Sequence, residues 1–331
     1  MKLVTMKLLA TFMLFAMVGC NWIDGARKDT KPPASTGKLE PKPAKEFVSF
    51  LNRQSGYVSS VRYDSVSLSS SVPGQFVPRL PSGMLVCSKP RNFRMQAGLA
   101  LGGDQLDVGS NPNEFWMFVK QSDPKYLFCS HSDFPKVQEK LPVPFETDWV
   151  LEALGMITYP ENRPYRIEIS ERDHAYYLSW EDTIASGQRV RKVVEFAGDR
   201  ATTTSPQVRR HLILTPTKAG VGTGWEIAAS AEIKQVQTKE VGFDPKTKQT
   251  VYVQVPTQVL LEWPIQKVKM DLTLGRVKLN EPMTPEEVTN LFEKPARLDN
   301  ANPVNLADLR FSAGPATGRD LPPPITERPR R

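Results

Sequence analysis

The chain has 331 residues, of which 40% are hydrophobic and 9% aromatic, and it carries a formal net charge of +7. Once its polar ends are set aside, about 250 residues remain, a length typical of one large β domain. The basic residues are spread over the chain instead of being gathered in one patch, so we expect no nucleic-acid partner.

The first twenty residues have the order of a secretory signal peptide. Lys2 and Lys7 precede an apolar run from Leu8 to Val18, and Gly19 lies directly before Cys20. The run holds eleven residues, whereas a membrane-spanning helix takes about 20. We therefore expect a signal that is cleaved, and not a permanent transmembrane helix.

Residues 17–20, Met-Val-Gly-Cys, resemble the lipobox of bacterial lipoproteins, although methionine stands where leucine is usual. The resemblance implies that Cys20 receives diacylglycerol and becomes the acylated first residue of the mature chain, so that a membrane is one partner. Asn21 is compatible with placement at the outer membrane, facing the periplasm of the cell envelope. The alternative is an ordinary signal peptide with a coincidental cysteine.

Composition sets the predicted boundaries. Residues 1–19 are the signal peptide, and residues 20–44 are expected to form a disordered tether, because they contain mainly Lys, Pro, Ser, Thr, Gly and Ala. Residues 45–296 form the predicted globular domain. Residues 297–331 are rich in Pro and Arg and have no periodicity, so we expect a disordered tail.

The predicted domain begins with an amphipathic helix over Lys45–Arg53. Runs with apolar and polar residues in alternation follow, and turn residues separate them. Because the turns are short, consecutive strands are expected to pair antiparallel as a meander. These predicted strands are Tyr57–Leu68, Gly83–Ser88, Asn92–Leu101, Glu114–Lys120 and Tyr126–Ser130.

A second helix is predicted over Glu146–Met156, and a third begins at the N-cap residue Thr284 and ends near Phe292. Many strands and few helices favour a mainly β domain of the α+β class with a single curved antiparallel sheet. The strands between these two helices are Tyr165–Ser170, His174–Glu181, Arg189–Ala197, Val208–Thr215, Trp225–Gln235, Thr250–Leu261 and Val268–Leu279.

Two cysteines remain after Cys20, and they lie on predicted strands that are not neighbours. In an oxidising compartment Cys87 and Cys129 could pair as a disulfide, and they could equally be two separate buried thiols. The sequence leaves both alternatives open.

Several short segments together carry a resemblance to a known family: residues 83–86, 89–95, 106–111, 114–118, 259–264, 268–272 and 292–295. Their pattern resembles the LolA/LolB-like superfamily of envelope lipoprotein carriers, and more closely the LolA-like lipoproteins of planctomycete-type bacteria. The resemblance implies a half-open β-barrel closed by short helices. It also implies that acyl chains or other lipoproteins are partners, in lipid or lipoprotein transport to the outer membrane, without a cofactor.

A curved sheet that is too open for its own side chains to fill the space it encloses leaves a cavity that a lipid can occupy. We place Phe93, Met95, Phe115, Met117 and Phe128 on one face of the predicted strands and Trp116 and Phe118 on the other, and Trp149 on the second helix. These aromatic and methionine residues are the candidates for lining the cavity. The alternative is that they pack the helices onto the sheet. Arg94 has the opposite parity to its neighbours and is expected on a solvated face.

No catalytic pattern is present. The three histidines, His131, His174 and His211, lie in no spacing that a metal or nucleophile needs, and the sequence holds neither a nucleophile elbow nor a phosphate-binding loop. The acidic residues between 168 and 181 are expected to form a solvated turn and not a metal site. We expect a protein that is not an enzyme. A structural or protein-interaction scaffold without a lipid ligand is the alternative function, and the oligomeric state stays undetermined.

Overall fold

The computed structural model describes residues 38–74, 77–100, 102–137, 147–184, 187–198, 206–217, 224–245 and 247–309. The expected signal peptide, Cys20, most of the expected tether and residues 310–331 of the expected tail lie outside these ranges. Among the described helices, none has the length and apolar character needed to cross a membrane.

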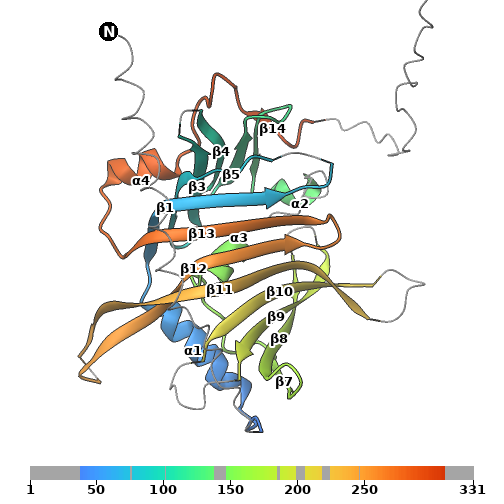
Figure 1. The fold of residues 1–331 in the computed structure, drawn as a ribbon, viewed down its shortest axis with the longest axis vertical. Coiled ribbons are helices and arrows are strands. Elements are labelled where there is room, and N and C mark those ends of the chain that lie inside the picture. Colours follow the sequence, from blue (N-terminus) through green and yellow to red (C-terminus); the bar gives the residue numbers. More distant parts are fainter. Residues whose placement is uncertain are drawn as a thin grey trace, which may run out of the picture. The chain divides into compact units, whose positions relative to one another are not determined.

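One curved sheet of fourteen strands forms the body of the described chain (Figure 1). Its spatial order is β14-β6-β5-β4-β3-β2-β1-β13-β12-β11-β10-β9-β8-β7. The pairing is antiparallel throughout, except that β14 runs parallel to β6. The sheet does not close, since β14 and β7 form its two edges. The predicted fold class, a mainly β domain with a single curved, unclosed antiparallel sheet, is confirmed.

The strands have these bounds: β1 (Ser60–Ser71), β2 (Ser82–Ser88), β3 (Asn92–Leu99), β4 (Gly103–Ser110), β5 (Glu114–Val119), β6 (Tyr126–Ser130), β7 (Arg166–Ser170), β8 (Ala175–Thr183), β9 (Arg189–Ala197), β10 (Val208–Pro216), β11 (Trp225–Asp244), β12 (Gln249–Trp263), β13 (Val268–Leu279) and β14 (Val304–Asn305). The helices are α1 (Ala44–Gly56), α2 (Phe134–Val137), α3 (Thr147–Ala153) and α4 (Pro285–Phe292).

The last helix begins as its sequence predicts. The Thr284 hydroxyl accepts a hydrogen bond from the backbone N–H of Glu287 at 3.2 Å, and the Glu287 carboxylate accepts one from the N–H of Thr284 at 2.7 Å. This reciprocal capping box satisfies two N–H groups that a helix end leaves without partners. Because the cap fixes its first turn, α4 starts directly after the turn that follows β13.

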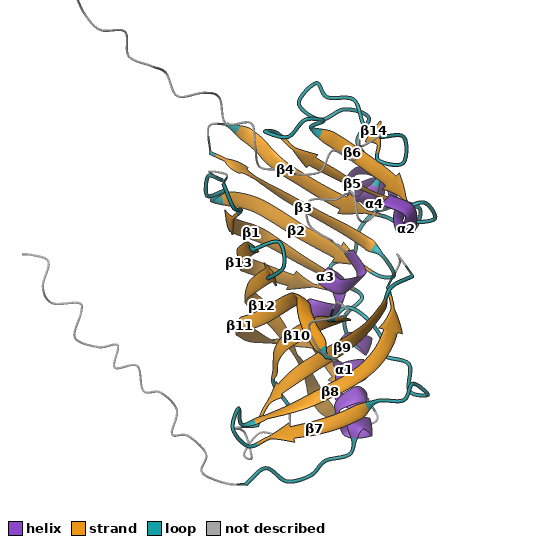
Figure 2. Ribbon diagram, turned by 90° about the vertical axis from the view of Figure 1, so that its right-hand side faces the viewer, coloured by secondary structure: helices purple, strands orange, loops and turns teal. Residues whose placement is uncertain are grey.

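Helices α1 and α3 pack on neighbouring parts of the sheet (Figure 2), α3 in the main core and α1 against β8 and β9. Phe47, Phe50 and Leu51 of α1 are buried among side chains of β8 and β9, such as Leu178 and Phe196. The rings of Phe47 and Phe196 lie with their centroids 4.8 Å apart. The strands from β7 to β10 are therefore covered by the chain's own helices.

Strand β4 is absent from the sequence-based prediction, because Asp107 and Gly109 are residues that strands disfavour. Contacts on one face of the sheet require an aspartate at position 107 and a glycine at position 109. Asp107 is fully buried and pairs with Arg94. The ring of Trp116 lies so close to Gly109 that a Cβ atom there would be 2.1 Å from its Cζ2 atom.

The ordered chain extends past both expected boundaries of the domain. Leu39 is buried before α1, and its N–H lies 3.2 Å from the carboxylate of Glu171. At the other end, Val304 and Asn305 form β14, and Leu306 is fully buried. The segments around these residues are polar and proline-rich, so composition alone does not reveal the few apolar residues that pack against the domain.

Cys87 and Cys129 are both buried thiols. They lie on β2 and β6, and three strands separate them in the sheet. The alternative of two separate thiols, and not a disulfide, is the one that the structure shows.

Candidate ligand-binding site

A cleft of about 760 Å³ lies over β1, β3, β4, β5 and β13. Its wall is mostly aliphatic and includes three methionines, one each from β3, β5 and β13, and two aromatic rings. The volume falls within the range of roughly 300–1,000 Å³ that small-molecule sites in proteins occupy. The apolar lining residues are Leu68, Val72, Val77, Pro78, Leu80, Met95, Leu106, Val108, Phe115, Met117, Val119, Trp263, Val268 and Met270.

Three directly opposed residues form a row across the cleft. Met95 of β3 pairs with Val108 of β4, and Val108 pairs with Met117 of β5. Residues opposite each other in an antiparallel pair point to the same face of the sheet. Because methionine is unbranched and polarisable, this row presents an adaptable apolar surface.

Polar side chains gather where the strands around the cleft meet their turns. Gln105 is near the start of β4, and Gln121, Ser122 and Asp123 form the turn after β5. Ser70 lies near the end of β1. The cleft thus has an apolar interior and one polar end, an arrangement suited to an amphipathic ligand.

The cleft contains three of the residues predicted from the sequence, Met95, Phe115 and Met117. Phe93 is fully buried in the core next to it. Trp149 is buried on α3, where its ring meets that of Trp263 edge to face, with centroids 5.9 Å apart. Trp149 thus supports a wall of the cleft from behind.

The remaining aromatic candidates lie on the opposite face. Trp116 and Phe118 have the parity expected of them, and residues 298–301 pack on this face. Phe128 pairs directly with Trp116, so its assignment to the face of Phe115 is wrong. The residues of the β5–β6 turn set that register, and alternation within one strand does not reveal it. The ring of Phe128 contacts the Lys294 ammonium at 4.3 Å.

The sequence-based prediction also missed one side of the cleft. Leu68, Val268 and Met270 come from β1 and β13, which are the first and the thirteenth strand yet neighbours in the sheet. Leu68 lies directly opposite Leu272 of β13. Alternation marks these residues as facing a core, but nothing local indicates which strand pairs with which.

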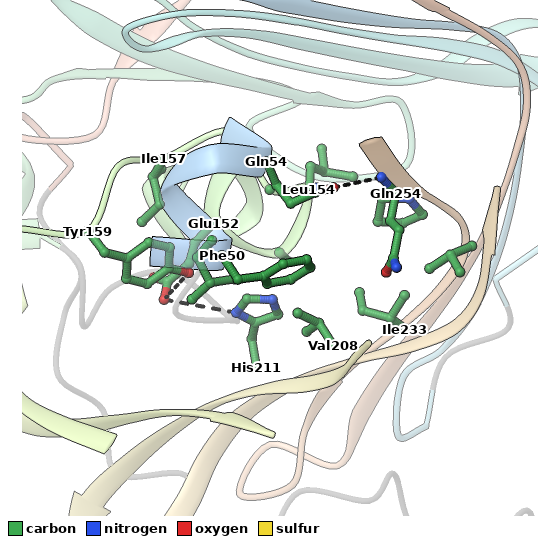
Figure 3. A pocket seen from close by; sticks show the side chains of 15 residues that line it. Phe50, Gln54, Glu152, Leu154, Ile157, Tyr159, Val208, His211, Ile233 and Gln254 are labelled. Atoms are coloured by element: carbon green, nitrogen blue, oxygen red, sulfur yellow. Dashed lines mark hydrogen bonds and ion pairs between the residues drawn. The ribbon is translucent and has the colours of Figure 1, made fainter. Parts of the chain in front are cut away.

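A second cavity, of about 50 Å³, lies between α1, α3 and strands β10 to β12 (Figure 3). Phe50 of α1 and Ile233 of β11 are among its apolar walls. Glu152 and His211 bring polar atoms to it, as the figure shows. This volume suits no ligand larger than a few water molecules.

Glu152 of α3 is the centre of a buried charge cluster at this cavity. Its carboxylate lies 3.0 Å from Nζ of Lys192 on β9 and 3.9 Å from Nδ1 of His211 on β10. The Tyr159 hydroxyl donates to it at 3.4 Å. Burial by itself raises the pKa of the Glu152 carboxyl, but Lys192 and His211 outweigh this effect and lower the pKa to about 2. Glu152 is therefore a carboxylate at neutral pH.

The cluster continues outward to the surface. Lys192 lies 3.9 Å from Asp182, and Asp182 lies 3.2 Å from Arg163. These groups line a further cleft of about 580 Å³ that shares Glu152 and Tyr159 with the small cavity. Since its charges are already matched in ion pairs, we interpret this region as the attachment of α3 to β9 and β10 and not as a ligand site.

Within the described ranges, no group of three or more His, Cys, Asp or Glu residues is arranged to hold a metal ion.

Arg94 has the predicted parity but is not solvated. Its side chain is buried against Asp107, beneath the end of α4. The expectation of a solvated face is corrected here, because α4 covers that face of β3.

No protein-family model and no curated protein sequence matches the chain. Among solved structures, a LolA superfamily protein from Nitrosomonas europaea matches at 11% identity and a TM-score of 0.42, over 77% of this chain and 99% of that one. A putative outer membrane lipoprotein-sorting protein domain from Vibrio parahaemolyticus matches at 8% identity and a TM-score of 0.41, over 75% and 98%. A DUF1329 family protein from Desulfovibrio piger matches at 11% identity and a TM-score of 0.38, over 76% and 100%.

Proposed function

We propose that this chain is a membrane-anchored envelope lipoprotein that binds lipid acyl chains, or the acyl chains of another lipoprotein, in the cleft over β1, β3, β4, β5 and β13. The observation that carries the proposal is the apolar cleft of about 760 Å³. The cleft of about 580 Å³ beside β8 and β9 is lined by paired charges, whereas the cleft over β1, β3, β4, β5 and β13 has a mostly apolar lining. A sheet that served only as a scaffold has no need of such a space.

Binding would rest on the hydrophobic effect. Each methylene group that enters the cleft contributes about 0.8 kcal/mol through its removal from water. Met95, Val108 and Met117 supply the surface along which a chain lies, and Gln105 and Gln121 at the polar end can hydrogen-bond to an ester or head group. No proton or electron transfer is needed, so the proposed role is carriage and not catalysis.

The proposal extends to the location of the protein. The lipobox-like residues 17–20 and the signal pattern before them support acylation of Cys20 and attachment to a membrane of the cell envelope. Residues 21–38 then separate the anchor from the domain. Delivery of the bound lipid or lipoprotein to the outer membrane is the transport role that we propose for this arrangement.

The test uses residues 20–331 with Cys20→Ser, so that an attached acyl chain is not mistaken for a bound one. Native mass spectrometry and lipid extraction are applied to the purified protein, before and after incubation with phosphatidylethanolamine vesicles. We expect phospholipid bound in stoichiometric amounts. A protein that is free of lipid at purification and after incubation would favour the scaffold function.

Two variants locate the ligand. Met117→Trp fills the cleft from a half-buried position, and Val288→Trp places the same side chain on the exposed face of α4. Loss of lipid in the first variant and retention in the second is the expected result. Equal lipid content in the two would show that the ligand lies outside the cleft.

A further inference from the structure

Strands β11 and β12 extend well beyond the strands that flank them. Strand β10 pairs with residues 225–232 of β11, and β13 pairs with residues 258–263 of β12. Beyond those limits, the described parts of β11 and β12 pair with each other as far as Asp244 and Gln249. Residues 235–244 and 249–256 thus form a two-stranded ribbon, which Figure 1 shows projecting from the sheet.

The base of this ribbon is firmly held. Val253 and Val255 are buried in the main core. The N–H of Gln254 donates to Oε1 of Gln54 on α1 at 2.8 Å, and the Tyr63 hydroxyl donates to the carbonyl of Pro256 at 2.9 Å. The ribbon is therefore a fixed projection, and its outer part is presented in a defined orientation.

Two large side chains near the end of the ribbon are exposed on one face. Phe243 is 64% exposed and Tyr252 is 54% exposed. Phe243 lies opposite Thr250, and Tyr252 is two residues from Thr250 on the same strand, so both rings are on the same face. Such diagonal neighbours are within reach of each other. Val251 and Val253 have the opposite parity, and their face is turned inward.

We propose that this aromatic pair docks the protein on an anionic lipid bilayer, with Phe243 and Tyr252 entering the interfacial region. The area argues against a protein partner. The two side chains together expose roughly 200–300 Å², whereas a stable protein interface needs about 800 Å² on each side. A bilayer needs no matching pocket, because lipids adapt to a small number of inserted anchors.

The charges on the ribbon agree with this partner. The sequence of the outer part holds three lysines (239, 246 and 248) and two acidic residues (240 and 244), a net charge of +1, and the whole chain carries +7. Lysines near an anionic surface are attracted to it, and the attraction falls off within a Debye length. Tyr252 lies opposite Glu240, and an exposed tyrosine, with an apolar ring and a polar hydroxyl, is typical of side chains that lie at the boundary between head groups and acyl chains.

This docking surface goes beyond the proposed acyl-binding function and does not depend on it. The cleft is lined by β1, β3, β4, β5 and β13 and by Trp263 at the end of β12, whereas the ribbon lies at the opposite end of β12 and on β11. A protein that carried no lipid could still dock on a bilayer through the ribbon.

The experiment measures binding of residues 20–331 with Cys20→Ser to vesicles of phosphatidylethanolamine and phosphatidylglycerol by co-sedimentation. The test variant is Phe243→Ser with Tyr252→Ser. The matched control is Ile265→Ser with Val288→Ser, because these two side chains are also exposed and apolar but lie outside the ribbon. We expect the test variant to bind about tenfold more weakly or worse, and the control to bind like the parent chain.

Salt and lipid composition complete the test. Binding of the parent chain is expected to weaken as salt screens the charges, and to weaken on vesicles of phosphatidylcholine alone. Equal binding of the test and control variants, or no binding of the parent chain to the anionic vesicles, would overturn the proposal. The lipid content of the purified test variant should stay at the parent level, which separates this outcome from a failure of the cleft.

Discussion

Arg94 and Asp107 form a bidentate ion pair across β3 and β4. The Nη2 atom of Arg94 is 2.8 Å from Oδ2 of Asp107, and its Nε atom is 3.2 Å from Oδ1. The remaining nitrogen, Nη1, donates to the carbonyls of Asn290 and Leu291 at 2.9 and 3.2 Å. These carbonyls belong to the last turn of α4, where backbone acceptors lack partners within the helix. One guanidinium therefore neutralises a buried carboxylate and fastens a helix to the sheet.

Replacement of Arg94 by leucine is expected to lower the free energy of unfolding by about 3–5 kcal/mol, because a buried charge is left without its partner. Among the described residues, the neutral donors Gln96 and Trp116, at 2.9 and 3.3 Å, would remain with Asp107. Urea unfolding measures the loss. The control is Arg91→Leu, whose partner Asp148 is 52% exposed, so that a change of about 0–1 kcal/mol is expected. Equal losses in the two variants would contradict the role of the buried pair.

The pair of Arg94 and Asp107 also shows which features the sequence predicts and which it does not. Alternation along β3 predicts correctly that Arg94 points away from Phe93 and Met95. It does not predict burial, because the carbonyl of Asn290 that meets Arg94 is 196 residues away. Distant packing of this kind, and not local propensity, also explains the missed strand β4, since Asp107 and Gly109 suit a strand only with Arg94 and Trp116 beside them.

The cleft, too, was predictable only in part, because some of its walls come from strands that are distant in the sequence. The sequence identifies Met95, Phe115 and Met117, which lie on strands joined by short turns. It does not identify Val268 and Met270, because no local signal places β13 beside β1. Phe128 was assigned to the wrong face because the length of a turn, and not the strand pattern, decides the register of β6 against β5.

The charge cluster at Glu152 predicts a loss of stability in acid. The pKa of the Glu152 carboxyl is lowered from 4.5 to about 2 in the folded protein. The folded state therefore gains stability above the unfolded pKa, and it loses this gain as the pH falls from about 4.5 towards 2. The shift corresponds to about 3 kcal/mol. Urea unfolding at a series of pH values is expected to show a shallower decline in Glu152→Gln than in the parent chain.

Glu181→Gln is the control for this acid effect, because Glu181 is an exposed partner of Arg189 and Arg191. Its variant should follow the pH dependence of the parent chain closely, since solvent screens an exposed pair. A Glu152→Gln variant whose stability declines as steeply as that of the parent chain would show that the carboxylate of Glu152 does not stabilise the fold.

Gly109 offers a test of packing on the face opposite the cleft. Its replacement by alanine would place a Cβ atom 2.1 Å from Cζ2 of Trp116, so we expect a loss of about 1–3 kcal/mol from overpacking. Gly56→Ala is the matched control, because no atom lies within 4 Å of a Cβ built there. Thermal unfolding of the two variants should differ clearly, and a Gly109→Ala protein as stable as the control would mean that Trp116 moves aside freely.

The thiols of Cys87 and Cys129 are expected to stay unreactive until the protein unfolds. Both are fully buried, and burial raises the pKa of the Cys87 thiol, so little thiolate is present. Strands β2 and β6 are four strand spacings apart in the sheet, or about 19 Å, whereas a disulfide needs Cα atoms within about 7 Å. In the Cys20→Ser chain, a thiol reagent should therefore label neither cysteine in buffer and both in urea, without a reductant. Labelling that appears in urea only after reduction would mean that the two cysteines pair and that the order of these strands is wrong.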